Sequence, residues 1–160
     1  MQSDHQKDMD RLVEFSKAVR ESTLKRLRLV PEGLENWRPS MNAMSFADIA
    51  HHLIECDLWL LKKVVIKNLA PLRGQNQECI VTDRDQFNAL INTLNETGAN
   101  RNKLIQSYAK KNPDEIIYDQ RFGDVSVWWI IVRGNIDHEI HHRGQLATYL
   151  RIIQDNNLTE

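Results

Sequence analysis

Apolar side chains recur along this chain every three to four residues, which is the spacing of an amphipathic helix. Residues from about 4 to 29 carry one such stripe, formed by Met9, Leu12, Val13, Ser16, Val19, Thr23, Leu24 and Leu27. Pro31, Gly33 and Pro39 then enforce a loop. The pattern therefore predicts a first long helix that ends just before Pro31.

Three further stretches show the same periodicity. A second helix is expected from the N-cap Ser45 to about Val64, a third from the N-cap region Thr82–Asp85 to before Pro113, and a fourth from near Asp124 or Ser126 to about Gln154. No alternating strand pattern persists. The fold expected is all-α, a four-helix bundle in a single domain over residues 1–160.

Composition, charge and hydropathy argue against several classes of partner and location. The formal net charge is −1, with 41% hydrophobic and 27% charged residues, which is ordinary for a globular domain. We therefore expect no nucleic-acid partner and no anionic membrane partner. No apolar run approaches a membrane span, and the N-terminus has no signal-peptide core, so a cytoplasmic location is expected. Cys56 and Cys79 could form one bridge but do not resemble a disulfide framework.

The histidines carry the candidate chemistry. His138 and His142 are four residues apart, so on a helix their rings share one face. On the second helix, His52 lies within the apolar stripe. A buried imidazole without a partner costs on the order of 1–3 kcal/mol, and a divalent ion between the two helices would satisfy all three. Three neutral imidazoles and open positions suit zinc, nickel or iron.

Other interpretations of these histidines remain open. A pair four residues apart is common on helix surfaces, and a lone inward histidine is usually a satisfied core residue. His51 and His141 lie beside the assigned positions and are alternative ligands. Cys56 follows His52 by one turn and could ligate as a thiolate, although we expect a small buried hydrophobic residue there.

Other side chains near the histidines have competing roles. Glu55 could orient a ligand or act as a base, but a solvated carboxylate is expected. Glu139 is expected to pair with Arg143. Trp128 falls roughly on the histidine side of its helix and could line the pocket, but core packing is expected for it. The polar interruption at residues 97–101 leaves either room for a ligand or a local bend.

Two motifs resemble those of the DinB/YfiT-like superfamily of four-helix-bundle proteins. They are the segment around Trp37-Arg38-Pro39 and Ser45-Phe46-Ala47-Asp48-Ile49-Ala50-His51-His52-Leu53, and the segment His138-Glu139-Ile140-His141-His142-Arg143-Gly144-Gln145-Leu146 with Tyr149-Leu150-Arg151. The resemblance implies an up-down-down-up bundle that is usually a homodimer. It also implies metal ligands at His52, His138 and His142.

The resemblance extends in fold to bacterial transferases and isomerases that use low-molecular-weight thiols. One hypothesis is therefore a metal-dependent thiol S-transferase, or a hydrolase, that acts on a small thiol and an electrophilic substrate. A second is a non-catalytic metal-binding or stress-associated protein. A third is a plain helical dimerisation module whose histidines are core or surface residues.

Overall fold

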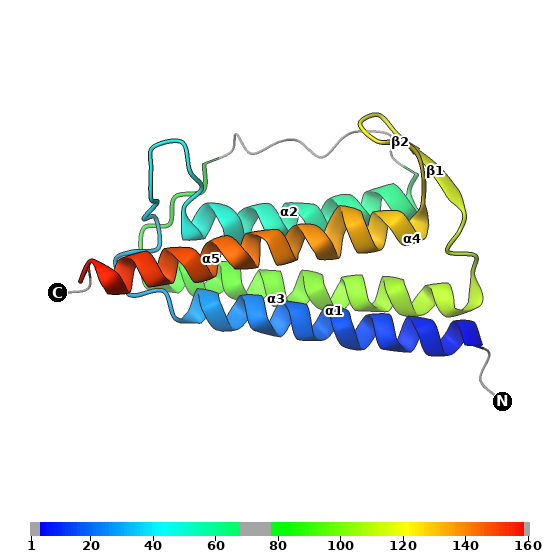
Figure 1. The fold of residues 1–160 in the computed structure, drawn as a ribbon, viewed down its shortest axis with the longest axis horizontal. Helices are drawn as coiled ribbons and strands as arrows, with labels where there is room; N and C mark the ends of the chain where they lie inside the picture. Colours follow the sequence, from blue (N-terminus) through cyan, green and yellow to red (C-terminus); the bar gives the residue numbers. More distant parts are fainter. Residues whose placement is uncertain (1–3, 68–77, 159–160) are drawn as a thin grey trace.

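The computed structural model describes residues 4–67 and 78–158 of the chain. Long helices lie side by side along one axis (Figure 1). The first three are α1 (Asp4–Arg28), α2 (Phe46–Val65) and α3 (Arg84–Ser107). The fourth combines α4 (Val127–Trp129), the π-helix η2 (Ile130–Ile136) and α5 (Asp137–Asp155) in direct succession. The predicted all-α four-helix bundle is confirmed.

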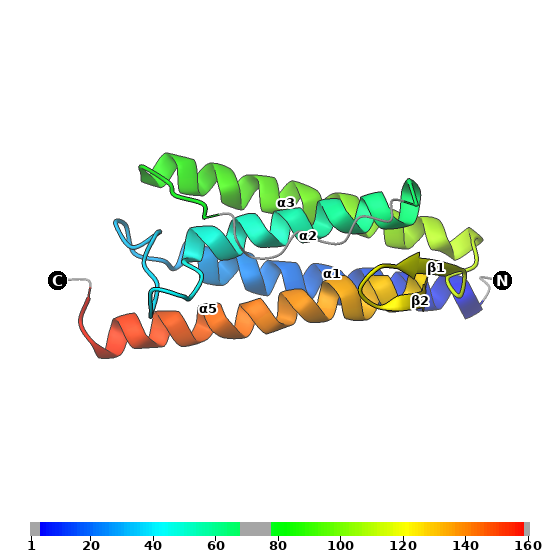
Figure 2. The same ribbon diagram turned by 90° about the horizontal axis from the view of Figure 1, so that it is seen from above.

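The helices follow the up-down-down-up order. Their colours show that α1 and α5 run in one direction while α2 and α3 run in the other (Figures 1 and 2). Because α2 and α3 are parallel, the end of α2 and the start of α3 lie at opposite ends of the bundle (Figure 1). Within the described ranges, none of the helices combines the length and the hydropathy needed to cross a membrane.

Side-chain caps define the helix starts that the sequence predicts. Ser45 and Asp48 form a reciprocal capping box at α2, in which Ser45 Oγ accepts from the Asp48 amide at 3.0 Å. Asp83 accepts from the Gln86 amide at 2.8 Å and caps α3. Ser126 caps α4. The three predicted N-termini are therefore confirmed.

A two-stranded hairpin between α3 and α4 was not expected from the sequence. After the short 3-10 helix η1 (Tyr108–Lys110), β1 (Ile116–Asp119) pairs antiparallel with β2 (Gly123–Ser126). An isolated hairpin is marginal in water, so it depends on packing against the bundle. Ile117 supplies that packing, because it joins the apolar core with 5% of its surface exposed.

The bundle core is divided into two apolar clusters. One lies toward the end of the bundle where α2 begins and includes Phe46, Leu94 and Leu146. The other lies toward the hairpin and includes Trp59 and Ile105. Burial of these side chains is the main favourable contribution to folding. Charged groups occupy the space midway along the bundle, between the two clusters.

These charged groups form an ionic layer of two arginines and two carboxylates: Arg20, Asp57, Arg101 and Glu139. Arg20 contacts Glu139 Oε1 through Nε at 2.8 Å and Asp57 Oδ2 through Nη2 at 2.8 Å. Arg101 Nη1 contacts Glu139 Oε2 at 2.5 Å. Burial raises the pKa of Glu139, but the two guanidinium groups outweigh it and bring the pKa down to about 2. The layer is therefore charged and balanced.

Uncharged groups complete the hydrogen bonding of the ionic layer. Thr97 donates to Asp57 at 2.7 Å, and Asn135 donates to Asp57 at 3.2 Å. Arg20 also donates to the Leu94 carbonyl. At Gly98, an added Cβ would lie 2.9 Å from Arg20 Nη1, so the arginine occupies the space that a side chain would need. The polar interruption at residues 97–101 is thus filled by the ionic layer.

The ionic layer predicts a large difference between buried and exposed charge substitutions. Arg101→Met leaves two buried carboxylates with one cation, and should lower the free energy of unfolding by about 3–5 kcal/mol. The matched control is Arg133→Met, which removes an exposed pair with Asp137 and should cost less than about 1 kcal/mol. Urea unfolding at pH 7 measures both. Equal losses would show that the layer does not stabilise the fold.

Candidate metal centre

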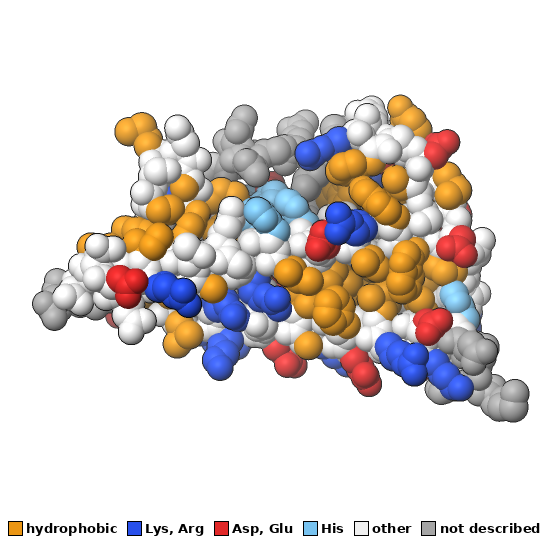
Figure 3. Space-filling model, viewed as in Figure 1, with side chains coloured by type: hydrophobic (Ala, Val, Ile, Leu, Met, Phe, Trp, Pro, Cys, Tyr) orange, Lys and Arg blue, Asp and Glu red, His pale blue; other side chains and the backbone are white. Residues whose placement is uncertain are grey.

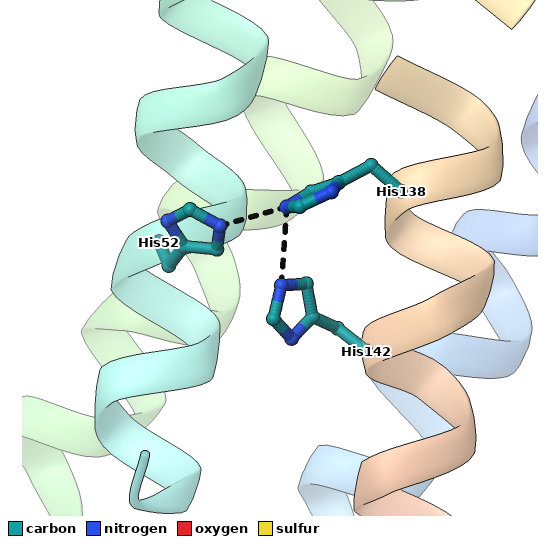
Figure 4. Close-up of side chains that lie close together, drawn as sticks. All are labelled: His52, His138 and His142. Carbon is teal, nitrogen blue, oxygen red and sulfur yellow. Dashed lines mark hydrogen bonds between the residues drawn. The ribbon is translucent and has the colours of Figure 1, made fainter. Parts of the chain in front are cut away.

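Three imidazole rings converge between α2 and α5 (Figure 4). His52 reaches across from α2, while His138 and His142 project from successive turns of α5. The Nε2 atom of His138 lies 2.8 Å from that of His52 and 3.1 Å from that of His142. One donor atom from each residue lies within 4.8 Å of the other two. The three predicted ligands are therefore brought together.

The Nδ1 atoms of His142 and His52 differ in their hydrogen bonding. His142 Nδ1 lies 2.7 Å from Gln145 Oε1, one turn further along α5. Because an amide oxygen only accepts, Nδ1 carries the proton and Nε2 keeps a free lone pair. His52 Nδ1 is buried and has no hydrogen-bond partner among the described residues. The spacing of residues along the chain did not predict this orienting role for Gln145.

Burial keeps the imidazoles neutral. It lowers the pKa of His52 to about 4, with further contributions from His138 and His51. It lowers the pKa of His142 to about 3, again with contributions from the neighbouring histidines. The pKa of His138 is also lowered, first by burial. Neutral imidazoles are the form that ligates a metal.

The donor set fits a divalent transition metal. Three neutral nitrogens point to one place, and two of their side chains, His52 and His142, are only 4% and 1% exposed. His138 is half-buried, and histidine side chains reach the surface midway along the bundle (Figure 3). Three protein ligands with access from one side resemble an open site rather than a closed structural one. Zinc, nickel and iron all accept such ligands.

The other candidate ligands, His51, His141 and Cys56, do not belong to the three-histidine cluster. His141 is exposed on the flank of α5, and His51 Nδ1 lies 3.9 Å from Glu55 Oε2. Glu55 therefore lies beside His51 on the edge of α2. Cys56 Sγ lies 3.6 Å from His52 Nε2, but burial raises the pKa of this thiol well above its usual range. Cys56 and Cys79 are both free thiols.

Two expectations about the surrounding side chains need correction. Glu139 does not pair with Arg143, because its face of α5 packs against α1 and α3, where Arg20 and Arg101 receive it. Trp128 is not packed in the core as expected; it precedes the π-helix η2, where the spacing of a regular α-helix no longer applies. Trp128 is 38% exposed. A π-helical segment cannot be read from the spacing of apolar residues, and such segments are frequent at functional sites.

Known proteins resemble this chain in sequence and in fold. The family model described as the DinB superfamily matches residues 16–146. A crystal structure of a DinB-like protein, YjoA from Bacillus subtilis, superimposes with a TM-score of 0.67 at 21% sequence identity. That match covers 90% of this chain and 92% of the other. No curated protein matches the chain.

The buried histidines predict acid sensitivity of the metal-free protein. Unfolding exposes His52 and His142, whose pKa values then rise from about 4 and about 3 toward 6.5. The unfolded chain thus takes up more protons below pH 6.5, and stability should fall by roughly 1 kcal/mol per pH unit for each histidine. Above pH 6.5 this effect vanishes.

Urea unfolding between pH 7 and pH 5 measures this effect. The window avoids Glu139, whose contribution is lost only as the pH falls from about 4.5 toward 2. The control is the double variant His52→Gln, His142→Gln, which should show a much flatter pH profile. A native protein whose stability is independent of pH over this range would contradict the account.

Proposed function

The chain belongs to the DinB superfamily, and we propose that it binds a divalent transition metal through its three-histidine cluster, His52, His138 and His142. We further propose that it is a metal-dependent transferase that uses a low-molecular-weight thiol. The observation that carries the proposal is the convergence of three Nε2 atoms from two helices.

The surroundings of the site support a functional metal. Gln145 fixes the tautomer of His142, as outer-shell partners of metal-bound histidines generally do. Glu139 follows His138 directly and is held in the ionic layer, which fixes the position of this part of α5. Gln145 therefore orients the His142 ring, while the ionic layer positions the turn of α5 that carries His138.

The proposed chemistry needs few protein groups beyond the ligands. When bound, a divalent ion of this kind lowers the pKa of a thiol or water that coordinates it. Burial keeps the Cys56 thiol protonated, so it does not compete with a substrate thiol for that position. The half-buried His138 marks the side from which a small thiol and an electrophile would enter.

A second candidate function is a non-catalytic metal-binding protein in which the ion joins α2 to α5. The burial of His52 and His142 favours it, because metal binding would then appear as folding stability.

We propose a homodimer in either case. Its support is the family, together with apolar side chains that gather over α1 and the start of the fourth helix (Figure 3). Phe15, which belongs to α1, is 50% exposed.

Metal analysis tests the ligand assignment. Protein purified without a histidine tag should hold about one zinc, nickel or iron ion per chain, and His138→Ala should lose most of it because two remaining imidazoles bind weakly. The exposed neighbour His141 provides the control, since His141→Ala should keep the ion. Unchanged metal content in His138→Ala would refute the assignment.

A thiol-transfer assay separates the two functions. The metal-loaded protein is mixed with a series of small thiols and 1-chloro-2,4-dinitrobenzene, whose ring carbon gains a sulfur bond as chloride leaves. A transferase should accelerate this reaction with at least one thiol, and His52→Ala should abolish the acceleration. Absence of turnover with every thiol, in protein that holds its metal, would favour the non-catalytic function.

A further inference from the structure

A cavity of about 420 Å³ opens beside the first turn of α2. The connection between α1 and α2 stands out from the bundle at this end (Figure 1), and residues 41–44 of the connection line one side of the cavity. Arg38, Asp48 and Glu78 also line it. Its volume is within the range of small-molecule sites, and neither function proposed above uses it.

The cavity lies next to the candidate metal centre along α2. Asp48 precedes His52 by four residues, so the two side chains are neighbours on one face of the helix, about 6 Å apart along its axis. In the same connection, the ring of Trp37 lies 5.9 Å from that of Tyr149, which follows His142 on α5 by about two helical turns. The cavity and the connection therefore adjoin the helix faces that carry the ligands.

Arg38 is the fixed cation of this cavity. Its Nη2 atom donates to Glu78 Oε1 at 2.7 Å and lies 3.2 Å from Asp48 Oδ2. Asp48 is buried and also accepts the backbone amides of Ser45 and Cys79, each at 2.7 Å. Asp48 thus holds Arg38 in place but has little capacity left to bind a ligand.

Arg38 and Glu78 retain hydrogen-bonding groups of opposite charge. Within residues 4–67 and 78–158, neither Nε nor Nη1 of Arg38 makes a hydrogen bond, and neither does Glu78 Oε2. The side chain of Arg38 is 26% exposed and that of Glu78 is 56% exposed, so a ligand can reach both. A guanidinium and a carboxylate side by side match a ligand group that carries both charges.

An α-amino-acid group has this pair of charges. Its carboxylate can accept hydrogen bonds from the guanidinium of Arg38, while its ammonium donates to Glu78. A carboxylate alone would meet two carboxylates and one guanidinium, and an ammonium alone would leave the guanidinium donors unused. The flexible thioethers of Met41 and Met44 can pack against the remaining carbon atoms.

We propose that this cavity binds an α-amino-acid group at the far end of a small thiol whose sulfur occupies the metal centre. This inference rests on the proposed function and names its substrate class. Because the cavity begins about one helical turn from His52, several bonds must separate the amino-acid group from the sulfur. The charged groups of free cysteine lie too close to its sulfur, whereas a γ-glutamyl amide of cysteine carries a complete amino-acid group further away.

Three matched thiols test the proposal in cobalt-loaded protein. γ-Glutamylcysteine carries the complete distal group, N-glutarylcysteine lacks its ammonium, and N-(4-aminobutanoyl)cysteine lacks its carboxylate. The near-ultraviolet sulfur-to-cobalt charge-transfer band measures the binding of each. γ-Glutamylcysteine should bind about tenfold more tightly than either of the others, a difference of about 1.4 kcal/mol.

Two variants separate the two halves of the distal group. Arg38→Met should weaken γ-glutamylcysteine and N-glutarylcysteine about tenfold, and should not weaken N-(4-aminobutanoyl)cysteine, which has no distal carboxylate. Glu78→Gln should weaken the two thiols that carry the distal ammonium, and should not weaken N-glutarylcysteine. Arg11→Met removes an exposed arginine of α1 and should change none of the three affinities.

The cobalt absorption of the thiol-free protein checks that each variant folds. Asp48 keeps its two backbone amides in Arg38→Met, so this variant should hold cobalt normally. Equal affinity for the three thiols, unchanged affinities in Arg38→Met, or a band with 2-mercaptoethanol alone would overturn this inference and leave the metal-and-thiol function standing. Native protein that fails to hold cobalt, or that gives no band with any of these thiols, would overturn both.

Discussion

The buried balance of charge between Arg20, Asp57, Arg101 and Glu139 is the constraint on which the rest of the structure depends. Each helix of the bundle contributes to this layer or to its hydrogen bonds, and its members are almost wholly removed from water. Burying ions is costly unless every charge is compensated, so the layer tolerates only one register of the four helices. Apolar packing alone would permit neighbouring registers more readily.

That register is also what assembles the candidate metal centre. Glu139 lies next to His138 on α5, and Asp57 lies next to Cys56 one turn beyond His52, so the layer anchors both helices close to their ligands. The charges of the layer are not among the causes that lower the pKa values of His52 and His142. These imidazoles are kept neutral chiefly by burial, and remain able to ligate.

The sequence predicted the helices and the trio of histidines because both depend on short spacings. Ser45 and Asp83 marked helix starts, and a separation of four residues placed His138 and His142 on one face. The ionic layer was missed because arginine and aspartate in an amphipathic pattern ordinarily indicate a solvated face. The hairpin was missed because its four-residue strands are too short for an alternating pattern, and its stability comes from distant contacts such as Lys63 with Asp119.

Anomalous scattering from crystals of protein purified without a tag, measured on both sides of the absorption edge of the metal found, tests directly whether the three imidazoles hold one ion. We expect one strong peak per chain, within about 2.0–2.2 Å of the Nε2 atoms of His52, His138 and His142. A peak held by His51 or His141 instead, or crystals with no anomalous peak at this place after soaking in zinc or nickel, would contradict this expectation.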